Sequence, residues 1–156
     1  MRKSKAKKRI LLPDPRFQDT LVTRFVNNLM LSGKKNKAFG IFYNTIDIVA
    51  EKTKEDGLQV WKRALTNVSP QVEVKSRRIG GANYQIPQEV RPERKVAMAI
   101  KWLIFYAKER KEHRMSSGLA SEIIAAAKNE GGAWKKKEDV HRMAEANKAY
   151  SHFKIN

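Results

Sequence analysis

The stretch Val72-Glu-Val-Lys-Ser-Arg-Arg-Ile-Gly-Gly-Ala-Asn-Tyr-Gln-Ile-Pro-Gln-Glu-Val90 differs in pattern from the rest of the 156-residue chain. Apolar residues alternate along its arms, as they do in a β-strand, whereas most of the chain has the apolar spacing of helices. Gly80-Gly81 in its middle suits a tight turn that needs positive φ. We therefore predict a β-hairpin at about residues 72–90, with Pro87 at an edge or at the end of strand pairing.

This hairpin is expected to bind something, because an isolated two-stranded hairpin is only marginally stable in water. Lys75, Arg77 and Arg78 precede the turn, and Tyr84 follows it. A hairpin with a basic arm and an aromatic side chain just past its turn is typical of nucleic-acid recognition.

The overall charge points to the same class of partner. The chain has 33 Lys and Arg against 16 Asp and Glu, a formal net charge of +17. Such an excess favours a polyanion, whose phosphates release counterions when they are neutralised. The chain has no cysteine, which excludes disulfides, thiol nucleophiles and cysteine zinc sites. With no apolar run near ~20 residues and no secretory signal pattern, we expect a cytoplasmic or organelle-matrix protein.

The remaining periodicity predicts an all-α protein, a six-helix body with the hairpin protruding between helices three and four. Residues 1–16 are expected to form a flexible basic arm, which Pro13-Asp14-Pro15 separates from a single helical domain at residues 17–156. The expected helices are an Asp19-capped helix to Leu31, residues 36–53, residues 57–68 after Asp56, Arg91-Pro92 to about Glu112, a helix from Ser116 or Ser117 that ends at Gly131-Gly132, and about Lys136 to Tyr150.

Several side chains are assigned to the core from their helical spacing. Trp61 is expected to be buried in the third helix. The fourth helix is the most apolar and is predicted to be the central helix of a bundle, with Trp102 and Phe105 among the residues that surround its apolar line. Met143 is expected on the narrow apolar face of the sixth helix.

Cations recur in three further places. The N-terminal arm is predicted to order on its partner, and Lys34-Lys35 follow the first helix, where they suit either RNA contact or a charge cap on the helix C-terminus. Arg94, Lys101 and Lys108 are spaced by seven residues and therefore share one face of the fourth helix.

The sequence contains no motif that requires an enzyme. It lacks a phosphate-cradling P-loop, a dinucleotide-binding glycine pattern and the His-Glu-x-x-His zinc motif. His113, His141 and His152 do not form a ligand-spaced cluster, and a His141–Glu145 pair is common on exposed helices. We therefore predict no catalytic residue, metal or cofactor.

Four stretches together resemble a known family. Phe25-Val26, Gly33-Lys34-Lys35, Ile41-Phe42 and Thr45 have the spacing of a signature of ribosomal protein seven of the small subunit, bacterial type. The other three stretches are residues 77–84, residues 91–94 and residues 141–149. The similarity covers nearly the whole chain.

The resemblance implies a primary binder of small-subunit ribosomal RNA that nucleates assembly of the subunit head. On matching positions, the residues that would face ribosomal RNA are Lys3, Lys5, Lys8, Arg9, Lys34, Lys35, Arg77, Arg78, Arg91, Arg94, Lys101 and Lys108. Those that would lie near the exit-site transfer RNA are Gly80, Gly81, Ala82, Asn83, Tyr84, Arg142 and Lys148. The C-terminal region would also meet the neighbouring ribosomal protein eleven.

Two residues depart from the family pattern. Gly118 stands where a larger, often basic residue is usual, which weakens a carried-over contact there. Trp134 stands where a smaller residue is common, and it would add a stacking surface or cover the end of the fifth helix.

Two other functions compete with this one. A helical DNA-binding protein would share the charge and the helicity, although no clear recognition helix stands out. An RNA-modifying enzyme would need a cofactor loop or an acid–base cluster, and neither is present.

Overall fold

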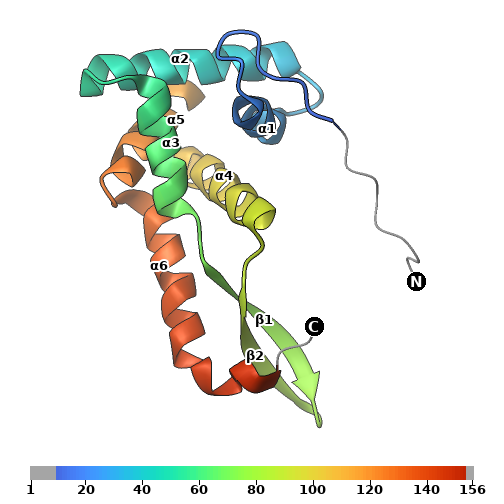
Figure 1. Ribbon diagram of the computed structural model, residues 1–156. Helices are drawn as coiled ribbons and strands as arrows, with labels where there is room; N and C mark the ends of the chain where they lie inside the picture. Colours follow the sequence, from blue (N-terminus) through green and yellow to red (C-terminus); the bar gives the residue numbers. More distant parts are fainter. Residues whose placement is uncertain (1–9, 154–156) are drawn as a thin grey trace. The chain divides into compact units, whose positions relative to one another are not determined.

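The computed structural model describes residues 10–153 of the chain (Figure 1). The chain divides into two compact units, Met1–Gly40 and Ile41–Asn156. Six α-helices, one 3-10 helix and one hairpin make up the described part. The fold is mostly helical, but the hairpin forms a two-stranded sheet, so the predicted class "all-α" was too narrow.

The first unit turns sharply before its helix begins. The buried carboxylate of Asp14 accepts hydrogen bonds from the backbone N–H groups of Arg16 at 3.0 Å and Phe17 at 2.8 Å. Helix α1 then spans Thr20–Leu29, with the predicted cap Asp19 accepting from the N–H of Leu21 at 2.8 Å. The helix ends at Leu29 and not at Leu31, which is exposed in the following loop.

Helices α2 (Lys35–Thr53) and α3 (Gly57–Val68) have the predicted bounds to within one residue. The Asp56 carboxylate accepts from the Leu58 N–H at 3.0 Å and so caps α3 as expected. Trp61 of α3 is fully buried, which confirms its assignment to the core.

The predicted hairpin is confirmed. Strand β1 (Val72–Ile79) pairs antiparallel with β2 (Ala82–Glu89), and Gly80 and Gly81 form the turn with φ of 56° and 89°. Pairing continues past Pro87, which lies opposite Val74, to the pair Val72–Glu89. Pro87 therefore does not end the ladder; it is tolerated because its backbone lies on an open edge.

Helix α4 spans Pro92–Glu109 and packs on α3, α5 and α6, as predicted for the central helix. It stops three residues before the predicted end at Glu112. Phe105 is 54% exposed, so its assignment to the apolar surroundings of the core was wrong.

Helices α5 (Met115–Ala127) and α6 (Gly131–Ala146) begin differently from the prediction. The N-cap residue of α5, Arg114, makes no side-chain capping hydrogen bond. Ser116 lies inside the first turn, where its carbonyl accepts from the Thr45 hydroxyl at 3.4 Å. Gly131, with φ of 90°, opens α6 instead of ending α5.

The C-terminal part of the predicted sixth helix is a separate element. After Asn147 caps α6, the 3-10 helix η1 spans Lys148–Phe153 and lies beside the hairpin (Figure 1). Met143, expected on the apolar face of α6, is 42% exposed.

The structure explains why a glycine stands at position 118, where a larger residue is usual in the family pattern. A Cβ atom at this position would lie 2.8 Å from the carbonyl oxygen of Ala107, so the first turn of α5 approaches α4 more closely than any larger residue permits.

Candidate nucleic-acid interface

A buried carboxylate links the base of the hairpin to the start of α4. Glu73 of β1 accepts from the Arg94 guanidinium at 2.8 Å and pairs with the Lys75 ammonium at 3.2 Å. Burial raises the pKa of the Glu73 carboxyl, but the hydrogen bonds and positive charges of Arg94 and Lys75 outweigh it, and the pKa lies below its ordinary value. Arg94 is thus held in place by Glu73, with more than half of its side chain still exposed.

The far half of the hairpin presents exposed cations. Arg77 lies opposite Tyr84, and Arg78 opposite Asn83. Since consecutive strand residues point to opposite faces, the two arginines leave the hairpin on different sides. The Arg77 guanidinium donates a long, 3.5 Å hydrogen bond to the carbonyl of Phe153 in η1, so the C-terminal helix lies on the Arg77 side.

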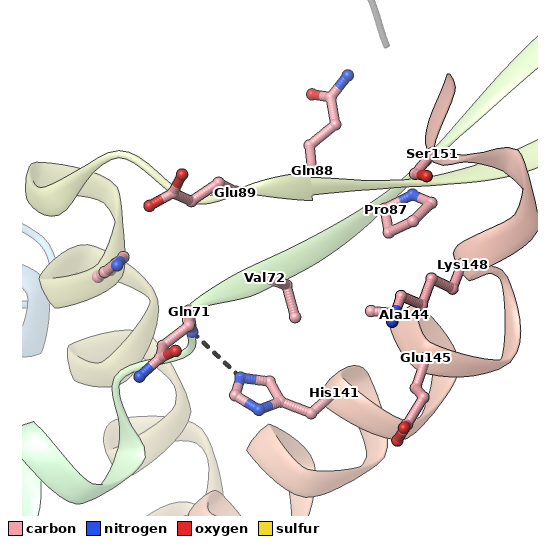
Figure 2. Close-up of a pocket in the computed structure, with 11 residues that line it drawn as sticks. Gln71, Val72, Pro87, Gln88, Glu89, His141, Ala144, Glu145, Lys148 and Ser151 are labelled. Carbon is pink, nitrogen blue, oxygen red and sulfur yellow. Dashed lines mark hydrogen bonds between the residues drawn. The ribbon is translucent and has the colours of Figure 1, made fainter. Parts of the chain in front are cut away.

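A cavity of about 570 Å³ separates the base of the hairpin from α6 (Figure 2). Cations and anions both line it, with Lys95 and Lys148 set against Glu89 and Glu145. Because the charges are mixed, the cavity does not select an anion. Figure 2 shows the imidazole of His141 pointing across it to the backbone of Gln71.

His141 fastens the hairpin to α6. Its Nε2 accepts a hydrogen bond from the Gln71 N–H at 3.1 Å, so the ring is neutral and carries its proton on Nδ1. Burial lowers the pKa of His141 below its ordinary value of 6.5, the charge of Lys137 lowers it further, and Glu138 opposes both.

We expect this arrangement to make stability depend on pH. Because the pKa of His141 is lower in the folded protein, the stabilisation is complete above about pH 6.5 and is lost as the pH falls through the folded value. Denaturant unfolding between about pH 8 and about pH 5 should show a steeper loss for the natural protein than for His141→Gln. The matched control is His113→Gln, which replaces an exposed histidine and should keep the pH profile of the natural protein. Identical pH profiles for the natural protein and His141→Gln would contradict the prediction.

The predicted stripe on α4 is present. Arg94, Lys101 and Lys108 are all exposed along one side of the helix, and Arg91, also exposed, precedes its first turn. Phe105 lies between Lys101 and Lys108 on the same side, four residues after one and three before the other. The stripe is therefore a basic surface with an exposed aromatic ring.

The other predicted contact residues fall into three groups. Lys34 and Lys35 are exposed after α1, and the Lys35 ammonium lies 5.6 Å from the centre of the Phe39 ring. Arg142 of α6 and Lys148 of η1 are exposed. Lys3, Lys5, Lys8 and Arg9 lie outside the described residues.

Sequence reasoning missed two residues of this surface. Glu73 was not singled out, because its two basic partners are recognisable only when β1 and α4 are placed together. Phe105 was assigned to the core because apolar residues surround α4 on several sides. Its position between Lys101 and Lys108 of the stripe could have indicated that it is exposed.

Over residues 10–153, no group of three or more His, Cys, Asp or Glu side chains is arranged to hold a metal ion. Within the same residues, no helix is long and apolar enough to cross a membrane.

Comparison with known proteins gives a consistent match. A family model described as "Ribosomal protein S7p/S5e" matches residues 1–148. Small ribosomal subunit protein uS7 of Cytophaga hutchinsonii is 63% identical over 155 residues, which cover 99% of this chain and 100% of the relative. The proteins of the same name from Flavobacterium johnsoniae and Amoebophilus asiaticus are 62% and 61% identical, again over 99% of this chain and 100% of each relative.

Proposed function

Since the chain belongs to the ribosomal protein S7p/S5e family, we propose that it is a structural protein of the small ribosomal subunit that binds small-subunit ribosomal RNA. The exposed arginines on a projecting hairpin are the observation that most directly supports RNA binding. The fixed position of Arg94, next to the hairpin and at the head of the α4 stripe, extends this surface along the helix. Cations held at fixed positions along the hairpin and α4 can bind the phosphates of a folded RNA in one register and orientation.

Finer roles belong to the same proposal. The protein would nucleate assembly of the subunit head, with Lys34, Lys35, Arg77, Arg78, Arg91, Arg94, Lys101 and Lys108 facing ribosomal RNA, and with Lys3, Lys5, Lys8 and Arg9 adding contacts from the N-terminal arm. The hairpin turn and the exposed Arg142 and Lys148 would lie near the exit-site transfer RNA, and the C-terminal region would meet ribosomal protein eleven of the small subunit. No catalytic step is part of the proposal.

The hairpin provides the sharpest test. Each phosphate contact that is lost should lower the magnitude of the salt slope, d log K/d log[salt], by about 0.7–0.9. Arg77→Ala with Arg78→Ala should therefore flatten the slope by roughly 1–2 units when a transcript of the head domain of ribosomal RNA is titrated at several salt concentrations. Both side chains are exposed, so the melting temperature should stay close to that of the natural protein.

Two further variants distinguish the loss of specific hairpin contacts from the loss of net positive charge. Lys52→Ala with Lys128→Ala removes the same charge from two exposed lysines of α2 and the end of α5, and it should leave affinity and slope nearly unchanged. Gly80→Val with Gly81→Val strains a turn that needs positive φ, so it should weaken binding by misdirecting the strands while keeping more of the slope. Unchanged affinity and slope in the double-arginine variant would exclude the hairpin as a binding surface. Duplex DNA that competes as well as the transcript would favour the DNA-binding alternative.

A further inference from the structure

Three aromatic rings join the hairpin to the C-terminal 3-10 helix. The Tyr84 ring of β2 lies with its centre 5.2 Å from the ring of Tyr150 and 5.7 Å from the ring of Phe153. The Tyr150 and Phe153 rings are nearly parallel, at 17°, with centres 6.5 Å apart. Tyr84 is half-buried under these two residues, although it lies only three positions from the turn.

The far half of the hairpin has little else to hold it. Residues 75–78 of β1 are all exposed, and the buried apolar side chains of this region, Ile86 and Val90, lie toward its base. Among the described helices, α6 and η1 pack on the hairpin, and α4 is joined to its base by the hydrogen bond from Arg94 to Glu73. The α6 attachment is at the base, where His141 accepts from Gln71. Because a hairpin fastened only at its base would bend freely, the direction of its outer half depends on η1.

We propose that Tyr150 and Phe153 are positioning residues that brace the hairpin through Tyr84 and thereby hold Arg77 and Arg78 in the orientation in which they bind RNA. The hydrogen bond from Arg77 to the Phe153 carbonyl belongs to the same brace. The second part of this inference rests on the proposed RNA-binding function, whereas the bracing itself does not.

The brace predicts a change in the free protein. One aromatic pair of this kind changes the equilibrium between the packed and the open hairpin by about 2- to 13-fold. Tyr150→Ala with Phe153→Ala removes both rings from Tyr84, so the amides of residues 77–84 should exchange with solvent roughly 10-fold faster, while those of α3, α4 and α5 keep their protection. Tyr150→Phe with Phe153→Tyr retains both rings and should restore slow exchange. Met143→Ala, which removes an exposed apolar side chain from α6, is the control.

RNA titration supplies the second readout. The double-alanine variant should bind the head-domain transcript roughly 3- to 10-fold more weakly. The salt slope should stay the same, because no cation has been removed. The ring-exchanged variant should bind like the natural protein.

Each outcome decides the inference. Faster exchange in the hairpin, together with weaker binding at an unchanged slope, supports it. Weaker binding with unchanged exchange overturns it, since the rings would then contact RNA directly. Faster exchange with unchanged affinity overturns the positioning role, and no change in either measurement overturns the brace. Failure of the natural protein to bind the transcript would refute the proposed function instead, and the exchange comparison would still test the brace.

Discussion

Replacing Trp61 by alanine is expected to lower the free energy of unfolding by about 3–5 kcal/mol, the usual cost of truncating a buried aromatic residue. The indole is fully buried, and its ring meets that of Phe42 edge-on, with centres 5.2 Å apart and an interplanar angle of 79°. Such a loss is a large part of the ~5–15 kcal/mol that stabilises a typical domain, so the melting temperature should fall by about 6–20 °C.

Chemical denaturation of the natural protein and the variant measures this loss. Trp102→Ala is the matched control: Trp102 is only half-buried on α4, so a smaller loss is expected. If Trp61→Ala instead abolished RNA binding and left unfolding unchanged, Trp61 would be a binding residue and its structural role would be refuted.

The second large effect is expected at Glu122, a carboxylate buried in α5. It accepts from the Arg110 guanidinium at 2.6 Å and from the backbone N–H of Ala133 at 2.8 Å. It therefore caps the N-terminus of α6, whose N-cap residue Glu130 makes no side-chain capping hydrogen bond, and it binds a cation at the end of α4. Glu122→Ala removes both interactions and should cost about 3 kcal/mol, at the lower end for a broken buried pair, because the partly exposed Arg110 regains water.

Two variants identify the source of that loss. Glu122→Gln keeps an acceptor for the Ala133 N–H and removes the charge, so its unfolding free energy should lie between the natural value and that of Glu122→Ala. Glu55→Ala breaks an ion pair with Arg63 in which both side chains are about half exposed, and it should cost about 0–1 kcal/mol. Equal losses for Glu55→Ala and Glu122→Ala would show that the buried pair has no special importance.

The elements that the sequence predicted well are those whose signals are local. Asp19 and Asp56 cap their helices with their own side chains, and Gly80-Gly81 form the turn that joins β1 to β2. These features depend on residues within a few positions of each other, so pattern and turn chemistry suffice to find them.

The errors arise where distant segments decide the structure. The serines near the start of α5 looked like caps, yet the Ser116 carbonyl meets Thr45, 71 positions earlier in the chain. Gly131 looked like the end of a helix because positive φ is typical there, but Glu122 caps the helix that Gly131 opens. Tertiary contacts overrode local preference in both cases.

The candidate site divides in the same way. The exposed arginines of the hairpin and the seven-residue stripe on α4 follow from spacing alone. The role of Glu73 between Lys75 and Arg94, and the packing of Tyr150 and Phe153 on Tyr84, require β1, α4, β2 and η1 to be placed side by side. The cations of the site can be found from the sequence, but the side chains that fix their positions lie in distant segments and can be identified only from the structure.

The hairpin also bears on how free copies of the protein behave toward one another. In the described residues its sheet has two strands, so each strand has an outer edge with no neighbouring strand. Open strand edges invite edge-to-edge pairing between molecules, and positive side chains discourage it because a second copy brings the same charge. Lys75, Arg77 and Arg78 line β1 and are exposed. We therefore expect that neutralising these three side chains would promote aggregation of the free protein, so the same cations would keep it soluble.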